Sequence, residues 1–312
     1  MQAQLPETGE TRPAAVFGGS CDAVLPPSEL AGALGSKHSA RELVPEGFAA
    51  DYAVAQIGGL RCAWEGDAYI LATLWPEAAA VESTPRGCGT QLADMDGDIH
   101  CDFDVTVNGT RIAGLAAFTG LTKNQSTATL ADVLAVFTAS ANAAEPVPLP
   151  IPAPESWSNP VSCSFLEPLV SDPTILNGAA NPVVGGAPGR GAYYSPIELE
   201  LRGILSDPMQ TECTIYAKKP LTDKQRAKGL FDYLGIEVVG GAAWAQNDVE
   251  ALSYATETTI EGADRAFVVK ESATSGYGTW FAVFDGPNYL SVRVDDTKAG
   301  RTSIAKVLAA ID

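Results

Sequence analysis

The sequence predicts an α+β protein of two related domains in tandem. Each domain is expected to have an antiparallel β-sheet that packs against helices at its N- and C-terminal ends. Three observations lead to this prediction. A proline-rich segment divides the chain of 312 residues near its middle. A similar order of cysteine, helix and strand patterns occurs on both sides of it, and each half closes with a hairpin pattern and an amphipathic helix.

Length and composition agree with two folded domains of about 150 residues each. The hydrophobic fraction of 46% and the charged fraction of 19% are typical of chains with buried cores. The formal net charge of −18 repels nucleic-acid phosphates and anionic membranes. Residues 1–152 hold 18 acidic and 7 basic residues, and residues 153–312 hold 20 and 13, so neither half is expected to dock on anionic lipid unaided. These charges argue against a nucleic-acid partner.

Residues 1–16 are expected to form a flexible tether, because this polar run has no apolar periodicity. It contains no signal peptide and no lipid-acceptor cysteine, so we interpret it as a mature or recombinant start from which an export segment was removed. Residues 5–9 spell LPETG, the sorting motif of Gram-positive wall anchoring. That motif works near a C-terminus, before a hydrophobic tail, so we interpret it here as chance or as a feature of cloning.

The first domain is expected to span residues 17–144, with a helix at 28–34 and a strand that begins near Cys62. Residues 103–107 alternate as a half-buried strand does, and Asn108-Gly109 predicts a tight hairpin turn. A closing helix is predicted by the spacing of its apolar residues, with Thr127 as the candidate N-cap; these residues are Leu130, Val133, Leu134 and Phe137.

Residues 145–156 are predicted to be a semi-rigid linker. Proline occupies every second position from 146 to 154, and proline fixes φ and lacks an N–H donor. An extended polyproline II segment of this length spans about 30 Å. An SH3-type ligand is a weaker interpretation, because the intervening apolar residues can pack on a neighbouring domain.

The second domain is expected to span residues 157–312, with a helix at 167–176 and a strand near Cys213. A hairpin turn is predicted at residues 285–288, and a closing helix with Thr302 as its candidate N-cap carries an apolar stripe of Ile304, Val307, Leu308 and Ile311. Additional elements are expected in this half: an amphipathic helix from Thr222 to Leu234, and alternating segments at 251–260 and 265–271.

Six cysteines, at positions 21, 62, 88, 101, 163 and 213, suggest disulfides and therefore an extracytoplasmic compartment. Spacing alone leaves all 15 pairings open, and buried free thiols are the alternative. None of the cysteines forms a C-x-x-C motif, so a redox motif or a zinc ribbon has no support.

The first domain resembles a cysteine-containing family of unknown function found in secreted proteins and lipoproteins of actinobacteria. Those domains begin Cys-x-x-Leu, continue with an E-[LV]-A-x-x-L-G helix and carry Cys-x-Trp on the next strand. The matching positions here are Cys21, Leu25, Glu29-Leu30-Ala31, Leu34-Gly35, Cys62 and Trp64. The resemblance implies a PsbP-like α+β fold, export and a Cys21–Cys62 disulfide. By extension it implies Cys88–Cys101 and, through the internal repeat, Cys163–Cys213; Tyr216 lies roughly where the aromatic residue falls.

Two segments are candidate binding sites. Asp94, Asp96 and Asp98 belong to a run of five aspartates in eleven residues around a glycine, which could offer oxygen ligands to Ca²⁺. The spacing departs from an EF-hand loop, so a solvated acidic turn is the alternative, and we expect no other cofactor. The glycine-rich stretch 177–191 has no periodicity and is expected to be a mobile loop. With it, Arg190, Tyr193 and Tyr194 are candidate ligand-binding residues, and a plain insertion is the alternative.

Catalytic motifs are weak. The two histidines are His38, expected in a surface loop, and His100, at a strand start, and neither belongs to a recognisable catalytic motif. Ser303 and Lys306 match the S-x-x-K motif of penicillin-recognising enzymes, but only six residues follow, so we interpret the match as chance.

The sequence therefore predicts a non-enzymatic binding protein that is secreted or anchored to the cell envelope. The expected partner is an envelope protein or a small amphipathic ligand, and membrane contact is expected only through a lipid anchor that this sequence lacks. The alternatives are an extracellular hydrolase that works with carboxylates and without histidine, as glycosidases do, and a structural component of a surface complex.

Overall fold

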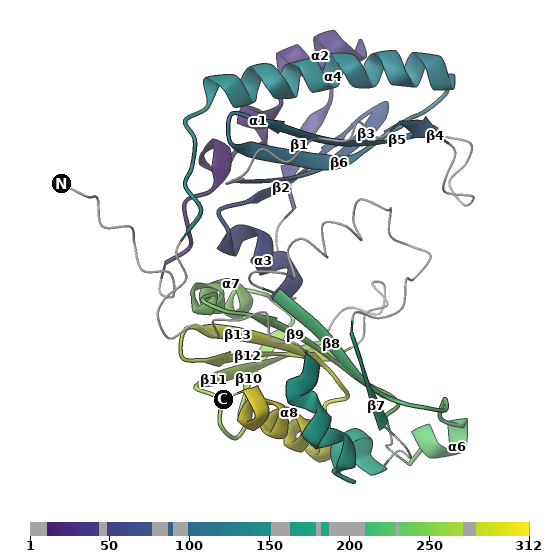
Figure 1. Ribbon diagram of the computed structural model, residues 1–312, viewed down its shortest axis with the longest axis vertical. Coiled ribbons are helices and arrows are strands. Elements are labelled where there is room, and N and C mark those ends of the chain that lie inside the picture. The colour runs from purple at the N-terminus through teal and green to yellow at the C-terminus, as the bar shows by residue number, and fades with distance from the viewer. Residues whose placement is uncertain are drawn as a thin grey trace, which may run out of the picture.

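The computed structural model describes residues 11–43, 49–76, 87–89, 99–150, 163–178, 182–186, 210–228, 231–270 and 279–311. In this part of the chain the protein is an α+β structure with two antiparallel sheets and three disulfides. Figure 1 shows the layers: helices α2 (Pro27–Leu34) and α4 (Lys123–Ala143) cover the first sheet, α3 (Ala49–Gln56) lies between the sheets, and α8 (Lys298–Ile311) covers the second. None of the described helices is both long and apolar enough to cross a membrane.

The first sheet has the order β1-β2-β3-β6-β5-β4, with every neighbouring pair antiparallel. Its strands are β1 (Ser39–Glu42), β2 (Leu60–Glu65), β3 (Ala68–Pro76), β4 (Cys88–Gly89), β5 (Ile99–Val107) and β6 (Thr110–Phe118). The predicted turn between β5 and β6 is confirmed, because Asn108 and Gly109 have φ angles of 47° and 72°.

The second sheet has the order β10-β11-β12-β13-β9-β8-β7, and it is also antiparallel throughout. Its strands are β7 (Pro182–Gly186), β8 (Gln210–Ala217), β9 (Tyr233–Val239), β10 (Ala255–Thr258), β11 (Arg265–Lys270), β12 (Thr279–Asp285) and β13 (Asn288–Arg293). The β12–β13 hairpin turns at Gly286-Pro287, inside the segment predicted from the sequence.

Short helices complete the two halves. The first half has η1 (Val16–Gly19) and α1 (Cys21–Val24). The second half has η2 (Cys163–Ser171), η3 (Ile175–Gly178), α6 (Asp223–Arg226), η4 (Ala243–Ala245) and α7 (Gln246–Glu250).

The two closing helices begin earlier than the sequence suggests. Thr122, and not Thr127, is the N-cap of α4: it accepts a hydrogen bond from Gln125 N and forms a capping box with that residue. Thr127 Oγ1 instead donates to the carbonyl of Lys123, inside the helix. Thr302 likewise donates to the carbonyl of Lys298. Threonine hydroxyls can bond within a helix as well as at its start, so residue type alone misplaced both caps.

Three other expectations for the second half are wrong. Residues 167–176 form 3₁₀ turns and not an α-helix, because Pro168 removes a donor and Leu176 has a φ of 53°. The helix expected from Thr222 to Leu234 shrinks to α6, and Leu234 is a buried residue of β9. The stretch 177–191, expected to be a mobile loop, contains β7, which pairs with β8 at the sheet edge. Proline is tolerated as the first residue of such an edge strand.

Each sheet packs its helix-covered face into a filled core. In the first half, Trp64, Phe103 and Phe137 are 0–1% exposed, and their rings are in contact. In the second half, Phe281 and Ile304 are fully buried, in a cluster that joins the sheet to α8 and η3.

The three disulfides are those expected. Cys21–Cys62 ties α1 to β2, and Cys163–Cys213 ties η2 to β8. Cys88–Cys101 links directly opposite residues of β4 and β5. No free cysteine remains in the chain that the structure describes.

Candidate functional site

The binding-site residues predicted from the sequence fall outside the described ranges. Asp94, Asp96 and Asp98 lie outside the described residues, and so do Arg190, Tyr193 and Tyr194. Within the described ranges, no group of three or more histidine, cysteine, aspartate or glutamate side chains could hold a metal ion. The calcium and loop-binding hypotheses therefore stay predictions.

The first sheet has an inner face, opposite α4, that carries polar groups. Strand side chains alternate between faces, so Cys101 and Phe103 enter the core while the neighbouring His100 and Asp104 point the other way. Asp104 is the last of the five aspartates in the acidic run, for which a solvated turn was the alternative to a Ca²⁺ site. It is nevertheless 6% exposed and not solvated.

Asp104 is buried because it forms a bidentate pair with Arg111 of β6. Arg111 Nε and Nη2 donate to Asp104 Oδ1 and Oδ2 at 3.0 and 2.7 Å. The guanidinium carbon also lies 5.4 Å from the ring centroid of Trp75. A buried charge is tolerated when it is paired and hydrogen-bonded in this way, so these residues form a rigid ionic unit on the inner face.

The two histidines occupy different environments. His38 is 8% exposed and not in a surface loop as expected: Nδ1 lies 3.1 Å from Ser36 O, and Nε2 accepts from Ala68 N at 3.1 Å. This arrangement requires the neutral tautomer with the proton on Nδ1. His100 is 9% exposed, and neither of its ring nitrogens has a hydrogen-bond partner in the described part of the chain. His38 thus has a structural role, because it accepts a hydrogen bond from the backbone at the β2–β3 turn.

The inner face of the second sheet is divided into an apolar and a polar part. The polar part contains Glu237, which is 5% exposed and accepts from Ser291 Oγ at 3.1 Å. Arg293 Nη2 lies 3.8 Å from the second carboxylate oxygen of Glu237. A second buried acid therefore has a hydrogen-bond donor and an arginine as neighbours on the adjacent strand β13.

Helix α3 covers the apolar part and joins the two halves. The Tyr52 ring makes edge contacts with Trp244 and Tyr289, at centroid distances of 5.7 and 5.4 Å. Trp244 Nε1 donates to Gln56 Oε1 at 2.6 Å, and both side chains are buried. A cluster of buried side chains from β9, β11, β12 and β13 surrounds these contacts. The first half thus contributes a helix to the core of the second.

The N-terminal segment reinforces this junction. The Arg12 guanidinium carbon lies 5.6 Å from the Trp244 ring centroid, and Arg12 Nη2 donates to Glu42 at 3.3 Å. Burial raises the pKa of the Asp248 carboxyl above its usual value, while the nearby Arg12 charge lowers it. Residues of the predicted tether that the structure describes therefore bridge the two halves.

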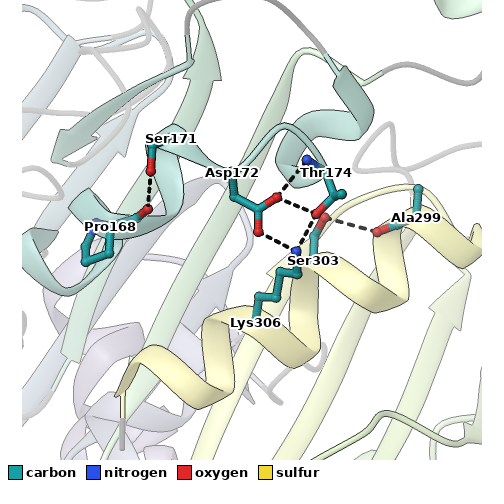
Figure 2. A network of polar contacts seen from close by, with 7 residues as sticks. All are labelled: Pro168, Ser171, Asp172, Thr174, Ala299, Ser303 and Lys306. Atoms are coloured by element: carbon teal, nitrogen blue, oxygen red, sulfur yellow. Dashed lines mark hydrogen bonds and ion pairs between the residues drawn. The ribbon is translucent and has the colours of Figure 1, made fainter.

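Figure 2 shows the polar network around the S-x-x-K match. Lys306 Nζ donates to the carboxylate of Asp172 and to the hydroxyl of Thr174. Hydrogen bonds from Lys306 and, to a smaller extent, from Thr174 lower the pKa of Asp172 to about 2, so Asp172 is ionised at neutral pH. Ser303 Oγ is buried and donates to the carbonyl of Ala299 at 3.0 Å. Lys306 is bonded to Asp172 and Thr174, and Ser303 is bonded to its own helix, an arrangement that fastens the η2–η3 segment to α8.

Comparison with known proteins adds no relatives: no protein-family model, no curated protein and no solved structure matches the chain. The resemblance to the actinobacterial cysteine-containing family therefore stays a prediction.

The sequence analysis missed the α3 junction and both buried acid–arginine pairs. A signal existed for one of them, because Asp104 and Arg111 flank the Asn108-Gly109 turn at positions that a tight hairpin brings to one face. No local signal connects Gln56 with Trp244, which are 188 residues apart.

Proposed function

We propose that this chain is an extracytoplasmic protein of two related domains that works by binding a protein partner, as a secreted or envelope-anchored component. The domains are residues 17–144 and 157–312, preceded by the 1–16 segment and joined by the 145–156 linker. The observation that carries the proposal is the set of three disulfides, because such bonds persist in oxidising compartments.

The order of the strands supports the relationship between the domains. The first sheet begins at one edge with β1-β2-β3, and β6, the last strand of that half, lies beside β3. The second sheet begins in the same way with β7-β8-β9, and β13, the last strand of that half, lies beside β9. Each half also ties a helical segment near its start, α1 or η2, to the second of these strands by a disulfide, and each closes with a helix on the same face. A duplication followed by additions to the second half accounts for these common features.

The internal ion pairs support binding over catalysis. Asp104 and Glu237 are paired with arginines, and Lys306 is paired with Asp172. Acid–base catalysts are usually poised near the working pH by their environment. These groups instead bond to partners within the fold, so they support its structure and leave recognition to its surface.

The filled cores favour a protein partner over a small amphipathic ligand. A ligand held between sheet and helix would need the space that Trp64 and Phe137 occupy in the first half and Phe281 and Ile304 occupy in the second. Close-packed interiors do not accept an additional molecule without rearrangement. Contact with a partner therefore involves the outer surfaces of the two halves.

Mass spectrometry of the protein isolated from its own host tests this proposal. Three disulfides make the chain lighter than its reduced form by the mass of six hydrogens, and native conditions should retain a protein partner. Recovery of free thiols from freshly lysed and alkylated cells would contradict the extracytoplasmic location. A small-molecule mass surplus without any protein partner would contradict the choice of partner.

A further inference from the structure

The connection between β8 and β9 concentrates positive charge in an acidic protein. Residues 218–228, the basic tip, contain Lys218, Lys219, Lys224, Arg226 and Lys228, against the single acid Asp223. The whole chain has 20 basic and 38 acidic residues in 312, so basic residues are about seven times denser in the tip than on average. The composition of the whole second half conceals this local excess.

The lysines of the tip lie at the surface and form no ion pair within the described part of the chain. Lys218, Lys219, Lys224 and Lys228 are all exposed, and none has an ion-pair partner among the residues that the structure describes. Arg226 differs, because it pairs with Asp232 at 2.8 Å. Elsewhere, basic residues such as Arg111, Arg265 and Arg301 form internal ion pairs. The free ammonium groups are therefore available to an external anion.

Two exposed tyrosines stand at the base of the tip. Tyr216 and Tyr233 are directly opposite in the β8–β9 ladder, so they share the sheet face that points away from the α8 core. Their side chains are 42% and 47% exposed, the highest values of any large hydrophobic residue in the described ranges. Tyrosine has an apolar ring and a polar hydroxyl, which suits the boundary between water and a lipid headgroup layer.

The tip is anchored by one residue within it and one that follows it. Leu221 and Phe231 are 8% and 6% exposed and belong to the second core. Thr222 and Gln225 form a capping box at α6, with Thr222 N donating to Gln225 Oε1 at 2.9 Å. Figure 1 shows α6 at the lower right extremity of the molecule, away from the first sheet. The lysines are thus presented on an ordered projection.

We propose that the basic tip and its tyrosine pair dock on the surface of an anionic lipid bilayer. Clusters of basic residues near anionic headgroups contribute additively to membrane binding. The cores of protein interfaces are depleted in lysine, whereas four of the five basic residues here are lysines. A flat membrane can be reached by a projection while the acidic body stays behind it, and charges beyond the Debye length of about 8 Å are largely screened.

This inference goes beyond the proposed function, because it adds a surface-binding site that does not depend on the protein partner. A chain found with its disulfides and a protein partner, but without affinity for vesicles, would contradict this inference and leave the proposed function intact.

Vesicle sedimentation with the oxidised full chain tests the inference. Vesicles of equal parts phosphatidylglycerol and phosphatidylcholine should bind the chain, and pure phosphatidylcholine vesicles should not. Binding should weaken as salt is added, because it depends on exposed charges. Equal binding to both kinds of vesicle, or binding to neither, would overturn the proposal.

Two variants and one control locate the contact. Lys218→Gln with Lys219→Gln should weaken binding by about 30-fold, since each basic residue near an anionic surface strengthens binding by about fivefold. The control Lys37→Gln with Lys123→Gln removes the same charge from exposed positions in the first half and should leave binding unchanged. Tyr216→Ser with Tyr233→Ser should cause a smaller loss that persists at high salt. All three variants should keep the melting temperature of the parent chain.

An equal loss in the lysine control would mean that overall charge, and not the tip, governs binding. Soluble dextran sulfate tests whether the tip binds an anionic polymer and not a membrane. A chain that binds this polyanion through the tip but ignores the vesicles would assign the tip to an anionic polymer and overturn the membrane proposal.

Discussion

The β2–β3 and β8–β9 connections occupy the same place in two sheets with the same initial strand order, yet they differ in every other respect. The first is a turn of two residues, Gly66 and Asp67, closed by His38. The second runs from residue 218 to 232 and carries the basic tip. Because a tight turn suffices to join these strands, the longer connection is not needed to build the sheet. Its unusual composition is consistent with the proposed docking role.

The Cys-x-Trp pattern of the first half differs from its nearest match in the second in a similar way. Trp64 follows Cys62 by two residues, so both enter the helix-covered core. Tyr216 follows Cys213 by three residues and lies on the opposite face, while Ile215 takes the core position. A shift of one residue along a strand moves a side chain from one face to the other. Tyr216 is therefore not the structural counterpart of Trp64.

The largest expected effect comes from removing the two corresponding disulfides one at a time. Cys21→Ala with Cys62→Ala opens a loop of 41 residues, and Cys163→Ala with Cys213→Ala opens one of 50. The chain-entropy model assigns about 4 kcal/mol to each, so chemical denaturation should show similar losses for the two double variants. A loss confined to one of them would show that the two bonds do not have corresponding roles.

The next effect separates the two aromatic residues. Trp64→Ala should lower the free energy of unfolding by at least about 3 kcal/mol, because the side chain is 1% exposed and packs against Phe137. Tyr216→Ala should change it by less than about 0.5 kcal/mol, because its side chain is largely at the surface. Urea titration of both variants measures the difference. Similar losses would place Tyr216 in the core and contradict the assignment of faces.

A single added methyl group should distinguish the two connections. A Cβ on Gly66 would lie 2.6 Å from His38 Cδ2, so the ring would have to move away from the Ala68 amide. Gly66→Ala should therefore cost about 2 kcal/mol, measured by thermal and urea unfolding. His38→Ala with Gly66→Ala should cost less than the sum of the two single changes, because each disrupts the same contact. Strict additivity would contradict the role given to His38.

The sequence predicts those features that depend on local chemistry. Strand alternation at 103–107 and the Asn108-Gly109 turn were sufficient to locate the β5–β6 hairpin. Apolar spacing also located α4 and α8, although their first residues depend on hydrogen bonds that residue type does not determine. The periodicity from Thr222 to Leu234 wrongly predicted a long helix. Phe231, which precedes β9, and Leu234, within β9, are three residues apart as on a helix face, and both enter the same core.

The candidate site could not be predicted for a different physical reason. The junction of Gln56 with Trp244 joins residues far apart in the chain, which no local pattern records. The basic residues of the tip are adjacent in the sequence, but a charge count over the whole second half is net negative and does not show them. Electrostatic contact at a membrane depends on charges within about a Debye length of the surface, so a count over 160 residues of the second half is the wrong measure.

The smallest effect concerns how the helices are attached in the two halves. In the first half, apolar residues such as Leu30 and Leu130 join α2 to α4. In the second half, the Asp172–Lys306 pair joins the η2–η3 segment to α8, as Figure 2 shows. Only the second attachment should therefore depend on pH.

The sign of this dependence follows from the pKa of Asp172, which folding lowers from 3.8 to about 2, mainly through the hydrogen bond from Lys306. The folded state binds the proton less readily than the unfolded state, so the pair stabilises above pH 3.8 and loses its effect as the pH falls toward 2. Asp172→Asn should cost about 1 kcal/mol at neutral pH, because both side chains are partly exposed to solvent. The stabilities of the variant and the parent should converge near pH 2.

Urea titrations across this pH range measure the difference, with Lys298→Met as a control on the same helix. A difference between Asp172→Asn and the parent that stayed constant with pH would contradict the assignment. A constant difference would mean that Asp172 acts through its shape and neutral hydrogen bonds to Thr174, and that both halves hold their helices without charge.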